Sequence, residues 1–222
     1  MSFITIRNIE KTYAGSEGGV QALKGINLEM GKGEFVAVMG PSGSGKSTLL
    51  TILGAMNPPS RGSLIVDEIE VYSLSSEKLA DFRHEYLGFV FQQLQLIPYL
   101  TALENVMLPL VISRTEGSKE EIALAALKKV GLGDYAHRLP GQLSGGEQAR
   151  VAIARAVVNE PLVILADEPT GNLDSKMGEE MMRLFKQLNE EGRTVIMVTH
   201  NEEAARHAER VVAIRDGCVV SS

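Results

Sequence analysis

Cysteine is almost absent from this chain of 222 residues, and tryptophan is missing altogether. The one cysteine, Cys218, cannot form an internal disulfide, and no histidine cluster beside it suggests a metal site. A small disulfide-stabilised secreted domain is therefore excluded, and a reducing cytosol fits the composition best. We expect Cys218 to be a packed strand residue.

Positive charge is also in short supply. Lysine and arginine number 22 against 28 aspartates and glutamates, which gives a formal net charge of −6. Proteins that bind nucleic acid usually carry a clustered basic surface. The composition therefore argues against DNA or RNA as a partner.

Long hydrophobic runs are missing too. The longest, such as Val151 to Val158, are far shorter than the roughly 20 residues of a membrane-spanning helix. The start of the chain alternates in character from Phe3 to Arg7 and lacks the basic segment and apolar run of a secretory signal. We therefore expect no signal peptide, and a separate membrane-spanning chain if the protein works at a membrane.

The chain does have enough hydrophobic sequence for one compact unit. With 44% hydrophobic residues, 1–222 can bury a core as a single domain. Phe3 to Met30 predicts two short antiparallel strands around the glycine-bearing turn from Ala14 to Gly19. Continuous apolar runs predict four strands buried on both faces of a parallel sheet, over Glu34–Met39, Leu87–Phe91, Leu162–Ala166 and Thr194–Val198.

Helical periodicity dominates between Thr101 and Asn159. It predicts helices over Ala102–Val111, Lys119–Val130 and Glu147–Asn159. Together the patterns predict an α/β fold with an antiparallel β subdomain and an inserted helical subdomain. We place the core roughly at 1–92 and 160–222, and the helical subdomain roughly at 93–159.

A glycine-rich segment lies between the strand ending at Met39 and a helix predicted over Lys46–Leu53. It consists of Gly40, Pro41, Ser42, Gly43, Ser44, Gly45, Lys46 and Ser47, followed by Thr48. Glycines at this spacing let successive backbone N–H groups face a phosphate, and the helix N-terminus adds partial positive charge. Lys46 then reaches the β and γ phosphates, and Ser47 offers a hydroxyl to Mg²⁺. The alternative is a merely flexible turn capped by Ser47.

Two carboxylates follow the buried run Leu162–Ala166. Asp167 and Glu168 come at the carboxyl end of that strand, which is where ligands bind in open α/β sheets. We predict that Asp167 holds Mg²⁺, directly or through water, and that Glu168 accepts the proton of an attacking water. A solvated acidic turn before Pro169 is the alternative.

Two further polar residues follow neighbouring strands. His200 comes directly after the run ending at Val198 and Thr199, and a neutral imidazole there is placed to contact a γ-phosphate. A structural histidine is an equally good interpretation of this sequence alone. Gln92 follows Leu87–Phe91, and its amide either ligates Mg²⁺ or caps a loop.

A second glycine motif runs from Leu143 to Gln148. Ser144 is placed to cap a helix, Gly145 and Gly146 expose backbone N–H groups, and Glu147 follows in the first turn. We interpret the motif as a second surface that faces phosphate. Standing alone, it would be more simply interpreted as an ordinary capped helix start.

In this order, and over essentially the whole chain, the motifs resemble the nucleotide-binding subunits of the ATP-binding-cassette (ABC) family. The resemblance implies a P-loop NTPase fold, ATP and Mg²⁺ as ligands, and Glu168 and His200 as catalytic residues. It assigns Gln92 to Mg²⁺ with Ser47 and Asp167, Tyr13 to stacking on adenine, and Asp174 to the loop that links two subunits. The motif from Ser144 to Glu147 would close over ATP held by a second copy.

The resemblance therefore implies a homodimer in the ATP-bound state. It also implies an integral membrane permease as partner, contacted near Gln92 to Leu100, and a position on the cytoplasmic face of the inner membrane. Segments 96–106 and 166–174 are most similar to the branch that contains LolD, MacB and FtsE, which favours export or lipoprotein extraction. An FtsE-like regulator of cell division and a soluble ABC ATPase are the alternatives. Substrate and transport direction are not encoded in this chain.

Overall fold

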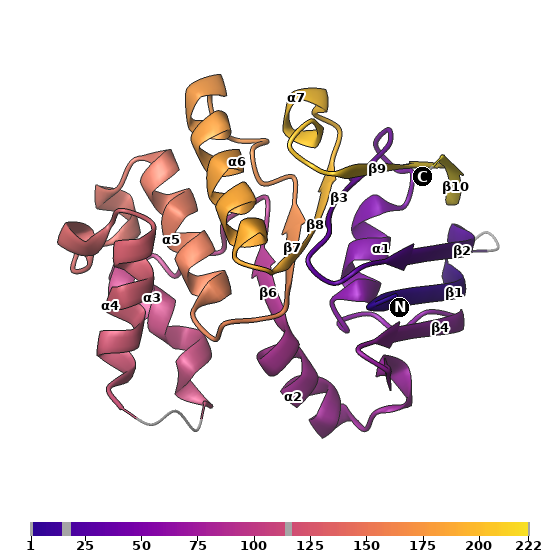
Figure 1. The fold of residues 1–222 in the computed structure, drawn as a ribbon, viewed down its shortest axis with the longest axis horizontal. Helices are drawn as coiled ribbons and strands as arrows, with labels where there is room; N and C mark the ends of the chain where they lie inside the picture. The colour runs from indigo at the N-terminus through magenta and orange to yellow at the C-terminus, as the bar shows by residue number, and fades with distance from the viewer. Residues whose placement is uncertain (1, 15–18, 114–116, 222) are drawn as a thin grey trace.

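The computed structural model describes residues 2–14, 19–113 and 117–221. Within these ranges the chain forms two β-sheets and a group of helices (Figure 1). The fold is of the mixed α/β class that the sequence predicts. Most of the glycine-bearing turn predicted from Ala14 to Gly19 lies outside the described residues.

The central sheet has the strand order β10-β9-β3-β8-β7-β6. All its strands run parallel except β10, which pairs antiparallel with β9 at one edge. Four of these strands confirm predicted runs with ends that shift by one residue at most. The bounds are Phe35–Met39 for β3, Leu87–Val90 for β6, Val163–Asp167 for β7, Thr194–Thr199 for β8, Arg210–Arg215 for β9 and Cys218–Ser221 for β10.

Side chains of the central strands are buried on both faces of this sheet. Phe35 and Ala37 of β3 pack into one hydrophobic cluster, whereas Val36 and Val38 pack into the other. This alternation follows from the two-residue period of a strand. It explains why β3, β7 and β8 appear in the sequence as continuous apolar runs rather than alternating ones.

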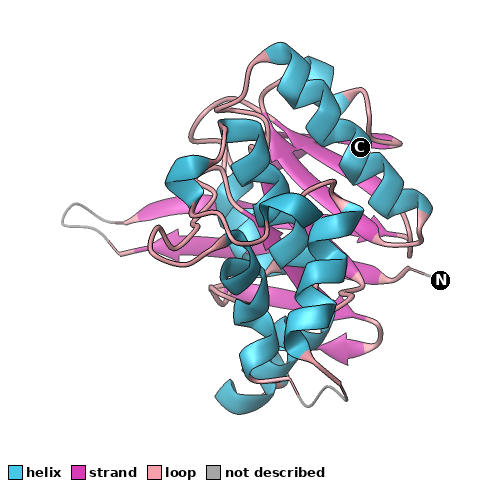
Figure 2. Ribbon diagram, turned by 90° about the vertical axis from the view of Figure 1, so that its left-hand side faces the viewer, coloured by secondary structure: helices cyan, strands magenta, loops and turns pink. Residues whose placement is uncertain are grey.

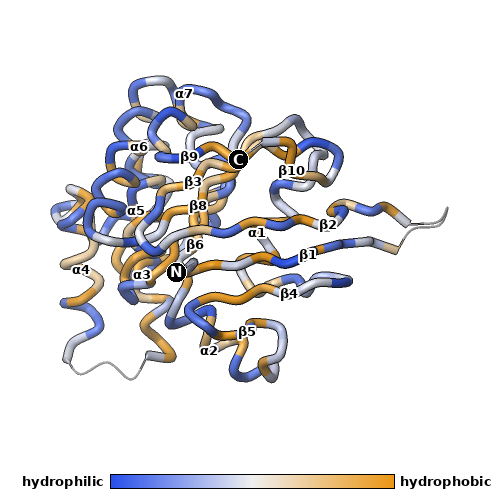
Figure 3. Tube along the Cα trace, turned by 45° about the vertical axis from the view of Figure 1, so that its right-hand side comes forward, coloured by the Kyte–Doolittle hydropathy of each residue, from blue (hydrophilic) through white to orange (hydrophobic). Residues whose placement is uncertain are grey.

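A second, antiparallel sheet has the order β2-β1-β4-β5, and Figure 3 shows β1, β2 and β4 side by side. Its strands are β1 (Ile4–Tyr13), β2 (Val20–Met30), β4 (Arg61–Val66) and β5 (Ile69–Glu70). The predicted pair is confirmed, but the prediction of short strands was wrong. The pairing of these two long strands contains several register shifts, which mark β-bulges or irregularities along β1.

The α-helices pack against the central sheet and beside it. Figure 2, viewed from the side of α3 to α5, shows helices in front of the strands. The bounds are Lys46–Leu53 for α1, Ser76–Tyr86 for α2, Ala102–Met107 for α3, Lys119–Lys129 for α4, Gly145–Val157 for α5, Ser175–Glu190 for α6 and Glu202–Ala205 for α7.

The predicted helix over Ala102–Val111 is interrupted. Its first part begins at Ala102 after the N-cap Thr101, whose hydroxyl forms a capping box with Glu104, and this α-helix ends at Met107. A 3₁₀ segment, Leu108–Val111, takes over because Pro109 has no N–H to donate and its ring disfavours a continued α-helix. The helix predicted over Glu147–Asn159 instead spans Gly145–Val157.

Cys218 is a strand residue, as predicted, but it is exposed, so the expectation that it would be packed was wrong. It lies on β10, the strand at one edge of the central sheet. Across the described ranges, no helix combines the length and apolar character that crossing a membrane requires.

Candidate nucleotide-binding site

The loop between β3 and α1 contains the predicted phosphate-binding residues. Gly45 is the N-cap of α1 and has a φ of 103°, a conformation that a side chain disfavours. At Gly40, an added Cβ atom would lie 2.1 Å from the carbonyl oxygen of Ile214 on β9. Both glycines are therefore required by the backbone path that wraps this loop around the start of α1.

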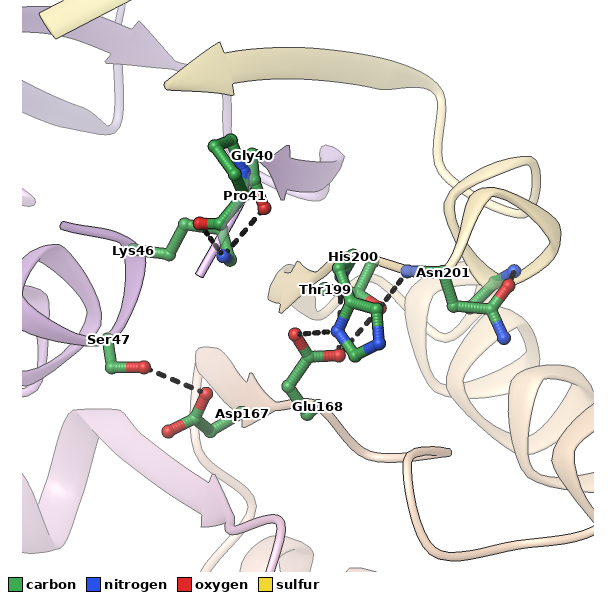
Figure 4. Close-up of polar contacts among 10 residues, drawn as sticks. Gly40, Pro41, Lys46, Ser47, Asp167, Glu168, Thr199, His200 and Asn201 are labelled. Carbon is green, nitrogen blue, oxygen red and sulfur yellow. Dashed lines mark hydrogen bonds and ion pairs between the residues drawn. The ribbon is translucent and has the colours of Figure 1, made fainter. Parts of the chain in front are cut away.

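Lys46 is folded back onto this loop. Its Nζ donates to the carbonyl oxygens of Gly40 at 2.8 Å and Pro41 at 2.9 Å (Figure 4), and the residue is 8% exposed. The hydroxyl of Ser44 is buried in the same loop without a hydrogen-bond partner among the described residues. An ammonium and an unpartnered hydroxyl at a helix N-terminus provide donors for an anion.

A cavity of about 620 Å³ opens in front of the loop. Most of the residues that sequence analysis assigns to one nucleotide site share this cavity, because the carboxyl ends of parallel strands lie at one sheet edge. Its lining is Ala22, Pro41, Ser42, Gly43, Gly45, Lys46, Ser47, Thr48, Gln92, Asp167, Glu168 and His200.

Asp167 lies opposite the first turn of α1. The hydroxyl of Ser47 donates to its Oδ1 at 3.3 Å (Figure 4). Burial raises the pKa of Asp167 above its ordinary value, and the negative charge of Glu168 adds to the rise. The Ser47 hydroxyl and the Lys46 ammonium oppose it with smaller effects. Ionised Asp167 is thus held where a cation would relieve its desolvation.

Replacing Asp167 with asparagine is expected to raise the melting temperature of the protein without nucleotide at neutral pH. Because the folded-state pKa is raised, the ionised carboxylate weakens folding as pH rises through the window above the ordinary aspartate pKa. The melting temperature should rise by roughly 2–4 °C for each kcal/mol by which the substitution increases the free energy of unfolding. Thermal melts between pH 4 and pH 8 check this.

The matched control is Asp134→Asn, which changes an exposed aspartate outside the cavity. Its melting temperature should not move. For Asp167→Asn the gain should shrink as pH falls and the wild-type carboxyl takes up its proton. An Asp167→Asn variant that melts below the wild type at neutral pH would show that the ionised Asp167 carboxylate does not destabilise the folded protein.

Glu168 is held by the end of the neighbouring strand β8. Its Oε1 lies 2.7 Å from Nδ1 of His200, and its Oε2 accepts the Thr199 hydroxyl at 2.9 Å (Figure 4). The backbone N–H of Glu168 donates to Val198 O at 2.9 Å. A φ of 44° at Glu168 places a non-glycine residue in the left-handed region, as is common at functional sites.

Thr199 was missed by the sequence analysis. The available signal was a hydroxyl residue at a strand end beside His200, but nothing in the local sequence shows that it contacts Glu168.

Gln92 lies at the junction of two cavities. The Gln92 residue is exposed and lines the phosphate-loop cavity. Its backbone carbonyl oxygen accepts a hydrogen bond from Asn172 Nδ2 at 3.0 Å. Farther along the same segment, Arg155 of α5 donates to the carbonyl oxygens of Leu94 at 2.7 Å and Gln95 at 2.6 Å. The segment after β6 is thus tied to the helix that begins at the second glycine motif.

The second glycine motif opens α5. Ser144 is the N-cap, its hydroxyl accepts from the backbone N–H of Glu147 at 3.3 Å, and its own N–H donates to Glu147 Oε2 at 2.6 Å. Hydrogen bonds from the backbone N–H and the side chain of Ser144 lower the pKa of Glu147. Gly146 is buried against Met177, whereas Ser144 and Gly145 are exposed. Within the part of the chain that is described, none of the four lines the phosphate-loop cavity.

Tyr13 and Asp174 also lie outside this cavity. Tyr13 ends β1, is 42% exposed, and its hydroxyl accepts Asn57 Nδ2 at 2.7 Å. Asp174 caps α6 by accepting the Met177 N–H at 2.9 Å. The single chain therefore brings together the phosphate loop, Gln92, Asp167, Glu168 and His200, but not Tyr13, Ser144 or Asp174.

A glycine loop at a helix N-terminus, an inward lysine and two carboxylates at the carboxyl end of β7, a parallel strand of the same sheet, define a P-loop nucleoside triphosphatase. The family model described as ABC transporter matches residues 23–171, which is more than half of the chain. The chain belongs to the ABC transporter family and is an ATP-binding and ATP-hydrolysing cassette of that family.

Individual relatives agree over nearly the full length. The chain is 51% identical over 220 residues to the ABC transporter ATP-binding protein MJ0796 of Methanocaldococcus jannaschii, covering 96% of this chain and 94% of that one. It is 49% identical to the macrolide export ATP-binding/permease protein MacB of Bdellovibrio bacteriovorus, covering 98% of this chain but 33% of MacB. The chain thus spans about a third of that relative's length.

A solved dimeric structure of MJ0796 has the same fold. It superimposes with a TM-score of 0.91 at 50% identity, covering 98% of this chain and 97% of that one. A second dimeric structure of MJ0796, in a post-hydrolysis state with ADP and Pi bound, also gives a TM-score of 0.91.

Proposed function

We propose that this chain works as a homodimer that binds two ATP molecules between its copies and drives a separate membrane permease. The observation that carries the proposal is that Ser144 and Gly145 are exposed at the start of α5 and lie outside their own chain's phosphate-loop cavity. A helix N-terminus with free N–H groups is suited to an anion. The dimeric state of the related MJ0796 supports a second copy as the source of that phosphate.

The cavity residues take distinct roles in this proposal. Lys46 and the loop from Gly40 to Thr48 bind the phosphates. Glu168 accepts the proton of the attacking water, and His200, whose ring contacts Glu168, faces the γ-phosphate. Tyr13 stacks on the adenine. Asp174 belongs to the loop that joins the two copies.

The residues present fit Mg²⁺. Ser47 Oγ and Asp167 Oδ1, two hard oxygen donors, are 3.3 Å apart, and Gln92 lines the same cavity. Hydroxyl, carboxylate and amide oxygens are typical ligands for an ion that also binds substrate phosphates. When bound, Mg²⁺ supplies positive charge against the phosphate oxygens. The chain's own residues orient the nucleotide and take up the proton.

The partner that this proposal requires is an integral membrane subunit, with the chain on the cytoplasmic face of the inner membrane. MacB, the relative of this chain that is named as an ATP-binding/permease protein, is about three times as long as this chain. By analogy with this export protein, we infer that the chain and a separate permease together carry out export or extraction. A cavity of about 550 Å³, which Gln92 helps to line, offers a docking surface in which the apolar side chains of Leu94, Leu96 and Pro98 alternate with amide side chains. Nearby Tyr99 is 77% exposed.

The test is to purify the tagged chain with its native partners in detergent and to identify them. An integral membrane subunit with an extracytoplasmic domain should copurify. Tyr99→Glu should reduce the recovery of this subunit about tenfold or more, because a buried carboxylate would replace an apolar contact. The control, Val220→Glu, alters an exposed apolar residue on β10, at the opposite edge of the sheet from β6. A ribosomal or DNA-repair protein as the copurifying chain would overturn the transport proposal.

A further inference from the structure

We propose that Thr199 is a positioning residue for Glu168. Its hydroxyl fixes Oε2 of the carboxylate at the end of β8, so that Oε1 is the oxygen that can exchange His200 for a water molecule. The inference rests on the proposed role of Glu168 as the general base. It adds a residue that touches neither nucleotide nor water in that role, and that acts through Glu168.

The hydrogen-bond directions at Thr199 leave one arrangement. The backbone N–H of Asn201 donates to Thr199 Oγ1 at 3.0 Å, so the hydroxyl acts there as the acceptor. Its single hydrogen is then available for Glu168 Oε2, which lies 2.9 Å away and is a pure acceptor when ionised. Thr199 thus connects the carboxylate to a backbone N–H that cannot move independently of the loop (Figure 4).

The two oxygens of Glu168 have contrasting neighbours. Oε2 accepts from the Thr199 hydroxyl and, at 3.3 Å, from the backbone N–H of His200. Among the residues that the structure describes, Oε1 has a hydrogen-bond partner only in the His200 imidazole, whose side chain is 69% exposed. At Oε1 the solvent-facing ring can be replaced by a water molecule, whereas at Oε2 the buried Thr199 hydroxyl stays in place. The carboxylate is therefore suited to pivot about Oε2.

Thr199 is itself held rigidly. It is 0% exposed, and its β-branched side chain has few rotamers available. In the sheet register it lies opposite Met39, the residue directly before the phosphate loop, while Val198 lies opposite Asp167. The sheet therefore fixes the position of the Thr199 hydroxyl relative to both the phosphate loop and the carboxyl end of β7. A glutamate alone has several rotatable bonds and would lose this alignment.

The test compares Thr199→Val, which keeps the shape and removes the hydroxyl, with Thr199→Ser, which keeps the hydroxyl. For Thr199→Val we expect kcat for ATP to fall about 10- to 100-fold, the size expected when a catalytic group is misplaced by about 1 Å. The KM for ATP should stay within about twofold, because the phosphate loop is untouched. Thr199→Ser should restore kcat to within about threefold of the wild type.

A double-variant cycle separates positioning from a general structural defect. In a Glu168→Gln background, Thr199→Val should not lower the single-turnover rate further, because the base it positions is already absent. A structural role would lower the rate by the same factor in both backgrounds, and that result would overturn the proposal. So would an unchanged kcat for Thr199→Val, or a serine variant that is as slow as the valine variant.

Failure of this inference is distinguishable from failure of the proposed function. If Glu168→Gln collapses hydrolysis while Thr199→Val does not, only the role of Thr199 is lost. If Glu168→Gln hydrolyses ATP as the wild type does, the general-base assignment itself fails. Should Thr199→Val melt below the assay temperature, Thr199→Cys takes its place, with a kcat expected between those of the valine and serine variants because a thiol is a weak donor.

Discussion

ATP turnover by the Glu168→Gln variant is expected to fall about 10²- to 10⁴-fold, the contribution typical of a positioned general base. The amide keeps the size of the side chain and can still accept the Thr199 hydroxyl, but it cannot take up a proton. The geometry around β8 should therefore persist while the chemistry stops. Steady-state phosphate release and ATP affinity, measured on the same preparation, check both halves of this expectation.

The control is Glu77→Gln, which changes an exposed glutamate in the first turn of α2. It should leave turnover unchanged. ATP affinity of Glu168→Gln should stay within about threefold of the wild type, because the phosphate loop and Lys46 are unaltered. Turnover that falls less than about tenfold would remove Glu168 from the role of base and leave water activation to another group.

Lys46→Met is expected to weaken ATP binding about 10- to 1000-fold. At an effective dielectric near 20, unit charges about 4 Å apart attract by about 4 kcal/mol before desolvation is subtracted, and each 1.4 kcal/mol is a factor of ten. Methionine keeps the length and the apolar stem, so the change is confined to the ammonium that contacts Gly40 and Pro41. Titration calorimetry or a fluorescent ATP analogue gives the dissociation constant.

Lys78→Met is the matched control, since Lys78 is exposed on α2 and outside the cavity. Its ATP affinity should equal that of the wild type. The melting temperature of Lys46→Met should also be recorded, because two carbonyl groups lose their ammonium donor. Wild-type affinity in a folded Lys46→Met variant would show that the lysine does not contact the phosphates.

The phosphate loop and the strand before it could be predicted because both signals are local. The glycines, Lys46 and Ser47 form a contiguous pattern, and β3 is a continuous apolar run because side chains of both its faces are buried. The same reasoning explains the success for β7 and β8. Their carboxyl ends had to meet at one edge once the sheet was parallel, and the cavity does bring Asp167, Glu168 and His200 together.

Strand β9 and the hairpin of β4 and β5 were missed for different physical reasons. β9 begins and ends with arginine and is buried only in part, so it lacks the continuous run of a central strand. The hairpin of β4 and β5 turns through Asp67 and Glu68, which have φ values of 48° and 66°. Such a turn favours Asn-Gly or Asp-Gly, and Asp-Glu lacks the glycine that would have indicated it.

The hydrogen bond from Thr199 to Glu168 depends on tertiary structure. It exists because β8 lies beside β7, with Asp167 opposite Val198. Strand order in a parallel sheet is not encoded in any short segment, because each crossover can place the next strand on either side. The exposure of Ser144 is likewise visible only in the fold, and it is the feature on which the proposed second chain at the site rests.

The most direct test of the shared site is the size of two variants under saturating ATP and Mg²⁺. Glu168→Gln should elute from a sizing column at twice the mass of one chain. Glu168→Gln with Ser144→Arg should elute as a single chain while binding ATP with unchanged affinity, because only the surface that closes over the partner's nucleotide is altered. A Glu168→Gln protein that stays monomeric, or a double variant that dimerises equally well, would contradict a site built from two copies.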